Sequence, residues 1–200
     1  MKINGAVDGL KKSIVKELES LYDMDVPPDR LWTEELINKM SAISSAINRE
    51  IAIYIDRKGQ IKDVSVGDFK TVDLYEIEGR RSVNRLSGIR CIHTHLNGSG
   101  MLSVVDISTT KILKLDMLAA VGVMHQRPTE IYVAVPSPVV VGDIDTFGPY
   151  SADKDNFDAL LEYIAEADEF LKTQSETLDN GKERAILVGV KTAETREING

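Results

Sequence analysis

Two of the chain's three histidines, His93 and His95, stand one residue apart in the segment IRCIHTH. This segment has the composition of a β-strand, and residues two apart on a strand point to the same face. The two imidazoles therefore share a face with Cys91, while Ile92 and Thr94 point the other way. Two imidazoles on one face can hold one cation, and catalytic zinc sites add a third protein ligand and leave a fourth position open. Cys91 is interpreted as a small buried apolar residue.

Asp106 is the candidate third ligand. It lies in the first turn of a predicted helix that follows the glycine-broken loop LNGSGML, so it can fold back toward the end of the strand. Ser103 opens this helix, and its hydroxyl is a candidate donor to a substrate oxygen that develops negative charge. The same pair also fits a capping box, in which the serine and the acid three residues later each cap the other's backbone. Both interpretations stay open, because a cap would also fix the direction of Asp106.

The segments around these residues alternate between helical and strand patterns of apolar side chains. Residues 8–22 carry apolar side chains at helical spacing, and a second helix is predicted from Thr33 to about Glu50. From residue 51 the apolar period changes to two, and IAIYID, RKG and QIKDVSV predict a strand, a turn and a returning strand. LAAVGVM and EIYVAVP predict two further strands joined by the turn-like HQRPT, and the apolar run of LAAVGVM favours burial on both faces.

The remaining residues are less regular. Residues 137–154 have no clear period and are expected to cross the surface, whereas NFDALLEYIAEADEFL predicts a strong helix and AILVGV a last strand. The order of all these elements predicts an α/β fold, with a mixed β-sheet flanked by helices.

Composition and charge limit the classes of function. The 200 residues are 42% hydrophobic and 28% charged, which is ordinary for a globular domain. The net charge of −8 argues against broad electrostatic attraction to nucleic acid or anionic membrane. One cysteine cannot form an internal disulfide, and no stretch has the length and apolarity of a signal peptide or a spanning helix. We therefore expect a cytoplasmic location and no membrane partner.

Any contact with RNA must depend on a local basic patch. The candidates are Arg80, Arg81, Arg85 and Arg90 in the connection GRRSVNRLSGIR, because arginine pairs bidentately with phosphate. The alternative is a solvated loop, with Glu76 and Glu78 nearby in the sequence.

The pattern of His93, His95, Ser103 and Asp106 resembles the H-x-H-x7-S-x2-D motif of the JAMM (JAB1/MPN/Mov34) metalloproteases. The resemblance implies a three-layer fold similar to that of cytidine deaminases, a Zn²⁺ ion held by the two histidines and the aspartate, and a serine beside the oxyanion. It also implies a general base at the end of the helix before the first strand, where Glu50 stands. The chain departs from the family in lacking a proline after His95 and a glycine after Glu50, and both departures bear on the peptidase groove more than on the metal.

A second resemblance covers nearly all 200 residues. INGAVDGLKKSIVKELESLY, INREIAIYIDRKGQIKDVSVGD, RLSGIRCIHTHLNGSGMLS and ERAILVGVKTAE are similar to the amino-terminal region of bacterial HflX GTPases, in the long form with an extra domain before the conserved core. That family binds GTP and associates with the large ribosomal subunit, where it rescues or splits stalled ribosomes. The chain has no G-x-x-x-x-G-K-[ST] motif, so GTP and Mg²⁺ are expected only in a GTPase domain outside this sequence.

The two resemblances together imply four parts and two candidate functions. The parts are an N-terminal helical segment over 1–30, a JAMM-like α/β domain over 31–150, a helix and linker over 151–180, and the start of the HflX core over 181–200. The first function is an accessory or regulatory domain of a ribosome-associated GTPase, with the large ribosomal subunit and the downstream domains as partners and a homodimer as a further option. The alternative is a zinc-dependent peptidase or isopeptidase of JAMM type.

Overall fold

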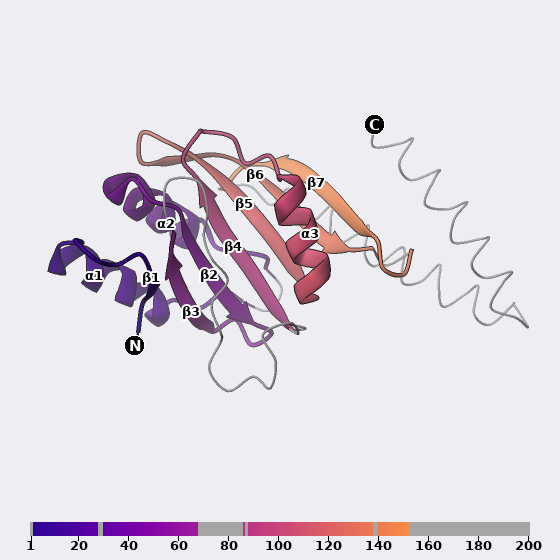
Figure 1. Cartoon of the computed structure of the whole chain (residues 1–200), viewed down its shortest axis with the longest axis horizontal. Helices are drawn as coiled ribbons and strands as arrows, with labels where there is room; N and C mark the ends of the chain where they lie inside the picture. The colour runs from indigo at the N-terminus through magenta and orange to yellow at the C-terminus, as the bar shows by residue number, and fades with distance from the viewer. Residues whose placement is uncertain (1, 28–29, 68–85, 87, 138–139, 153–200) are drawn as a thin grey trace, which may run out of the picture.

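A computed structural model of the chain describes residues 2–27, 30–67, 86, 88–137 and 140–152. Within these ranges a seven-stranded sheet has the order β1-β3-β2-β4-β5-β6-β7 (Figure 1). The strands are β1 (Asn4–Gly5), β2 (Ile51–Asp56), β3 (Ile61–Val66), β4 (Ile89–His95), β5 (Met117–Met124), β6 (Arg127–Pro136) and β7 (Ile144–Tyr150). The helices are α1 (Lys12–Glu19), which continues into a 3-10 turn (Ser20–Asp23), α2 (Glu34–Ile47) and α3 (Val104–Leu113).

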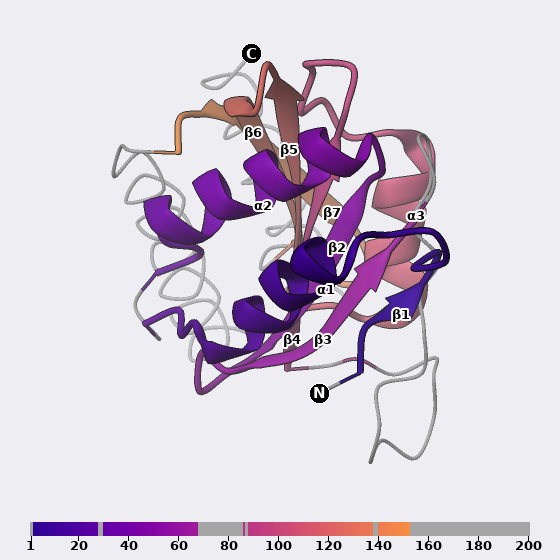
Figure 2. The same cartoon turned by 90° about the vertical axis from the view of Figure 1, so that its left-hand side faces the viewer.

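The described elements form three layers. Helices α1 and α2 cover one face of the sheet and α3 covers the other, as the two views show (Figures 1 and 2). The sheet is mixed, because β4 pairs in parallel with β5 and β1 with β3, while the other neighbours are antiparallel. The predicted α/β class, a mixed sheet flanked by helices, is confirmed.

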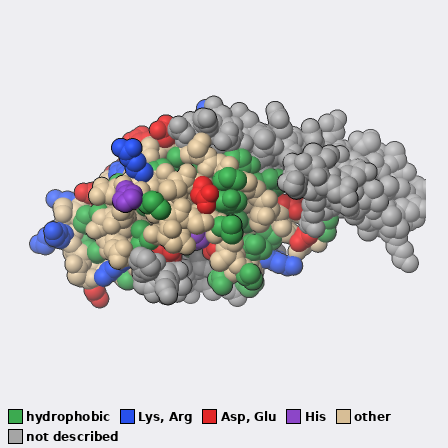
Figure 3. All heavy atoms as spheres, turned by 90° about the horizontal axis from the view of Figure 1, so that it is seen from above, with side chains coloured by type: hydrophobic (Ala, Val, Ile, Leu, Met, Phe, Trp, Pro, Cys, Tyr) green, Lys and Arg blue, Asp and Glu red, His purple; other side chains and the backbone are tan. Residues whose placement is uncertain are grey.

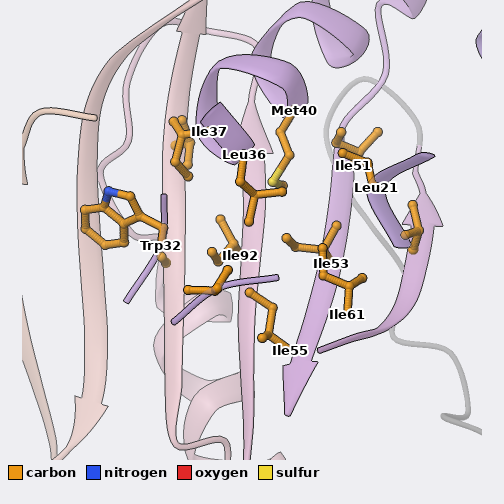
Figure 4. Packing of buried hydrophobic residues seen from close by; sticks show 14 of the residues in the cluster. Leu21, Trp32, Leu36, Ile37, Met40, Ile51, Ile53, Ile55, Ile61 and Ile92 are labelled. Carbon is orange, nitrogen blue, oxygen red and sulfur yellow. The ribbon is translucent and has the colours of Figure 1, made fainter. Parts of the chain in front are cut away.

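The larger core lies between the sheet and α2 (Figure 4). Thr33 caps α2 by accepting a hydrogen bond of 3.2 Å from the Leu36 amide, and the helix ends at Asn48 in the left-handed conformation. Its apolar side chains pack on alternate residues of the central strands, and each fully buried aliphatic side chain contributes about 1.5–3 kcal/mol. The buried residues include Trp32, Leu36, Ile37, Met40, Ile53, Ile55 and Ile92.

A smaller core lies on the opposite face, under α3. It contains Ala52, Tyr54, Leu86, Ile89, Cys91, Leu113, Leu115 and Leu118. The burial of Cys91 confirms its interpretation as a small apolar core residue, and burial raises the pKa of its thiol to about 12. Residues Met117 to Val123 of β5 are all buried between β4 and β6, which confirms the two-face burial predicted for LAAVGVM.

Two sequence predictions about the chain after β5 are wrong. The turn after β5 contains only His125 and Gln126, both with positive φ, and β6 already begins at Arg127. Pro128 is tolerated in β6 because the pairing with β7 begins only at Ile131, so the missing amide of the proline breaks no ladder there. Residues 137–154 were expected to cross the surface, but they contain β7, which pairs antiparallel with β6.

The ends of the chain bear on the predicted domain boundaries. Near the N terminus, β1 hydrogen-bonds in parallel to β3 and so belongs to the same sheet as the strands after residue 31. The predicted helix over 156–171 and the predicted strand AILVGV lie outside the described residues, as do most of 151–180 and all of 181–200. Among the helices in the described ranges, none is long and apolar enough to cross a membrane.

Candidate metal centre

Strand β4 places the two histidines. His93 lies between Ala52 of β2 and Ala120 of β5, whose small side chains leave room for the imidazole ring. Thr94 points to the α2 face, where its hydroxyl lies 2.7 Å from the Ser44 hydroxyl. The predicted division of the strand is confirmed, with Ile92 in the α2-side core and Cys91 in the α3-side core. Both histidines therefore face the layer that contains α3.

The N terminus of α3 brings Asp106 to them through a capping box. The Ser103 hydroxyl accepts a hydrogen bond of 3.1 Å from the Asp106 amide, and the Ser103 amide donates one of 2.7 Å to Asp106 Oδ2. The serine hydroxyl also donates to Oδ2, at 2.7 Å. The other carboxylate oxygen, Oδ1, lies 3.3 Å from His93 Nε2. Capping and ligation therefore do not exclude each other, because the cap holds one oxygen and directs the other toward the histidines.

The side chains of three potential ligand residues converge at this point. The Nε2 atoms of His93 and His95 are 2.8 Å apart, and Asp106 Oδ1 and Oδ2 lie 3.3 and 3.8 Å from the first and second of them. Tetrahedral zinc with bonds of about 2.0–2.1 Å requires ligand atoms about 3.3–3.4 Å apart. The separation of His93 Nε2 and Asp106 Oδ1 matches that value, whereas the two imidazole nitrogens are closer together and would have to move slightly apart to hold one ion. The two nitrogens and one carboxylate oxygen are also a donor set that suits Zn²⁺.

The pKa shifts of His95 and Asp106 favour the forms of these two groups that bind a cation. Burial lowers the pKa of His95, and the neighbouring His93 lowers it further. Burial alone would raise the pKa of Asp106, but the hydrogen bond and charge of His93 and the hydrogen bonds from Ser103 outweigh it and hold that pKa well below its ordinary value. A neutral imidazole and an ionised carboxylate are the forms that bind metal, so little proton release would accompany binding at these two groups.

The surface beside the cluster is apolar. The side chains of Met101, Val104 and Val105, which flank Ser103 in the sequence, are 65%, 80% and 71% exposed. In the space-filling view, hydrophobic side chains gather into a patch on one face of the domain, beside acidic side chains (Figure 3). By contrast, the side chains of His93 and His95 are only 9% and 15% exposed. The cluster is thus recessed, with apolar residues on the loop and helix turn next to it.

The candidate general base, Glu50, is buried at 6% exposure and immediately precedes β2. Ala52 and Tyr54 belong to the α3-side core, so the period of two places Glu50 on that same face as the histidines. Among the described residues, the group of converging ligand atoms consists of His93, His95 and Asp106 and does not include Glu50. Glu50 therefore shares the face of the cluster without being one of its three ligands.

The candidate RNA-binding arginines are only partly described. Arg80, Arg81 and Arg85 lie outside the described residues. Arg90 lies on β4, where its guanidinium donates to the carbonyl of Arg30 and burial lowers its pKa. Arg90 is thus engaged within the domain, between the sheet and the segment before α2.

Sequence reasoning missed the residues that hold the loop between β4 and α3. The Ser99 carbonyl lies 3.1 Å from His95 Nδ1, and the Ser99 hydroxyl donates a hydrogen bond of 3.0 Å to Glu130 on β6. No periodicity links these positions, because Ser99 and Glu130 are 31 residues apart. The sequence does contain one local sign of a tightly packed loop, which is the pair of glycines that flank Ser99.

Comparison with protein-family models, with curated proteins and with solved structures finds no match to this chain. The class of protein is therefore defined by its own fold and site: an α/β domain with a seven-stranded mixed sheet that carries a group able to hold a metal ion.

Proposed function

We propose that the chain is a Zn²⁺-binding accessory domain of an HflX-type GTP-binding protein that acts on the ribosome. The observation that supports the metal is the convergence of His93, His95 and Asp106, whose ligand atoms all lie within 4.8 Å of one another. Three protein ligands leave a fourth position for water or a substrate oxygen. When bound, Zn²⁺ would supply a Lewis acid at this position.

The accessory role is supported by the sequence. The runs similar to HflX GTPases extend over nearly the whole chain, and the metal cluster lies within one of them, RLSGIRCIHTHLNGSGMLS. Since the chain has no phosphate-binding glycine loop, GTP hydrolysis belongs to a separate GTPase domain of the parent protein. In this proposal the domain regulates that GTPase or its contact with the large ribosomal subunit.

A second candidate function, a JAMM-type zinc peptidase or isopeptidase, is favoured by Glu50. A buried carboxylate on the same face as the histidines is suited to take a proton from a water nucleophile. Ser103, at the start of α3, would then stabilise the oxyanion through its hydroxyl after giving up its bond to Asp106.

Metal analysis tests the site shared by both functions. Protein purified without chelators is expected to contain or take up one Zn²⁺ per chain, measured by elemental analysis and calorimetric titration. His93→Ala and Asp106→Asn should abolish uptake, whereas His125→Asn is the matched control, because it removes the third histidine from an exposed turn. A wild-type chain that takes up no zinc would refute the site and, with it, the peptidase.

Two further measurements separate the functions. If the domain is a peptidase, Glu50→Gln should abolish hydrolysis of an isopeptide-linked substrate while the zinc content stays at the wild-type value. If it is an accessory domain, zinc-loaded protein should show no hydrolysis, and Asp106→Asn in the full-length protein should change GTPase activity or co-sedimentation with the large subunit.

A further inference from the structure

We infer that Glu130 is a positioning residue for the metal centre, although it lies on β6 and is not a ligand. This inference rests on the proposed zinc site. Glu130 Oε1 accepts two hydrogen bonds from the loop between β4 and α3, one of 3.0 Å from the Ser99 hydroxyl and one of 3.2 Å from the Gly100 amide. One carboxylate oxygen therefore holds both the side chain and the backbone of the loop at its middle.

The loop in turn fixes the imidazole of His95. The Ser99 carbonyl lies 3.1 Å from His95 Nδ1, and because a carbonyl only accepts, this nitrogen must carry the proton. The lone pair of the neutral ring is then on Nε2, which faces His93 Nε2 and Asp106. An outer hydrogen bond of this kind sets both the tautomer and the ring orientation of a metal-binding histidine. The chain of contacts thus runs from Glu130 through Ser99 to His95.

The loop has little freedom to take another position. Thr129, the neighbour of Glu130, donates from its hydroxyl to the Gly98 carbonyl at 2.7 Å. A Cβ atom on Gly100 would lie 2.4 Å from the Glu130 carbonyl oxygen, and one on Gly122 would lie 2.7 Å from the Gly100 amide nitrogen. The loop backbone therefore lies directly on β5 and β6, and glycine is required on both sides of this contact. Glu130 supplies the acceptor that the loop needs there.

Glu130 acts in this proposal only as a hydrogen-bond acceptor for the loop. Two substitutions at this position should therefore differ in their effect on zinc affinity. Glu130→Gln keeps one side-chain oxygen at the same reach, whereas Glu130→Ala leaves the Ser99 hydroxyl and the Gly100 amide without this partner. We expect Glu130→Ala to weaken zinc affinity by roughly 10- to 100-fold, and Glu130→Gln to restore it to within a few-fold of wild type. Ser99→Ala, which removes one of the two bonds and keeps the carbonyl, should give an intermediate loss.

The test measures zinc affinity by competition with a chromophoric chelator, and the His95 tautomer by ¹⁵N NMR of the metal-free protein at a pH where imidazole is neutral. In the wild type the His95 proton should be on Nδ1, and in Glu130→Ala it should redistribute toward Nε2. Wild-type affinity or an unchanged tautomer in Glu130→Ala would overturn the inference. If Glu130→Ala does not fold, the same two measurements on Ser99→Ala decide in the same way.

The failure of the inference can be told apart from the failure of the zinc site. If the wild type binds no zinc, the proposed function is refuted, while the tautomer measurement still tests whether Glu130 positions His95. If the wild type binds zinc and Glu130→Ala binds it equally well, the zinc site stands and only the positioning role is lost.

Discussion

Ser103 both caps α3 and hydrogen-bonds to the candidate metal ligand Asp106. Ser103→Ala therefore tests whether the helix cap contributes to metal binding. Alanine would remove the 3.1 Å bond from the Asp106 amide to the Ser103 hydroxyl and the 2.7 Å bond from that hydroxyl to Asp106 Oδ2. The bond from the backbone amide of residue 103 to Oδ2 would remain. The carboxylate would thus keep one of its two contacts with residue 103 and gain freedom to rotate.

The expected magnitude has two parts. Loss of a serine N-cap lowers the free energy of unfolding by about 1 kcal/mol, with or without metal. Loss of a hydrogen bond to a metal ligand lowers the affinity for zinc by roughly 10-fold or more. At a fixed saturating zinc concentration, this is about 1.4 kcal/mol less stabilisation of the folded state. Ser103→Ala should therefore cost about 1 kcal/mol in chelator and about 2.4 kcal/mol in zinc.

Thr33→Ala is the matched control. Thr33 caps α2 by accepting from the Leu36 amide at 3.2 Å, and α2 lies on the other face of the sheet from the metal centre. Its loss should cost about 1 kcal/mol in both conditions. Urea unfolding followed by circular dichroism, with chelator and with zinc, measures both variants. If Ser103→Ala loses the same free energy in both conditions, as Thr33→Ala does, the serine is only a helix cap and the coupling is refuted.

Three further predictions concern the core, a buried acid and the ribosome. Ile53→Ala, at a fully buried position of β2, should lower the free energy of unfolding by about 2–5 kcal/mol in urea titration, and a loss below about 1 kcal/mol would contradict the packing on α2. Burial raises the pKa of Asp63 above 3.8 although two side chains donate to it, so the folded state holds this proton more tightly than the unfolded state. The free energy of unfolding of the wild type relative to Asp63→Asn should therefore fall as pH rises from 3.8 through the raised pKa, and a difference that is constant with pH would contradict this. Reversal of Arg80 and Arg81 to glutamate in the full-length protein should reduce co-sedimentation with the large ribosomal subunit, and an unchanged profile would exclude this basic patch.

The parts of the site that the sequence predicted are those encoded within a few residues. The segment IRCIHTH forms β4 over the predicted residues, because its apolar run and alternation are local properties. Ser103 caps α3 as predicted, since a serine followed three residues later by an acid is a local signal. These two elements already bring together His93, His95 and Asp106, and this is why the candidate ligands could be named from spacing alone.

The elements that were missed depend on contacts between distant residues. Strand β7 alternates only partly between buried and exposed residues, and Gly148 and Pro149 interrupt its period, so its pairing with β6 is what defines it as a strand. The two-residue turn at His125 and Gln126 has positive φ at both positions without the glycine or asparagine that usually marks such a turn. Glu130 was missed for a similar reason, because its partner is a loop 31 residues earlier.

One carboxylate, that of Asp106, both caps α3 and faces the histidines. Asp106 Oδ2 satisfies the N terminus of α3 through Ser103, while Oδ1 lies toward His93. The backbones of both histidines are held by β4, which lies between β2 and β5, and the Ser99 carbonyl contacts the His95 ring. Since the sheet and the helix cap fix both supporting elements, we expect little ordering entropy to oppose the binding of an ion by these ligands. We therefore expect the fold to persist when chelator removes the metal, unlike a small zinc-dependent fold.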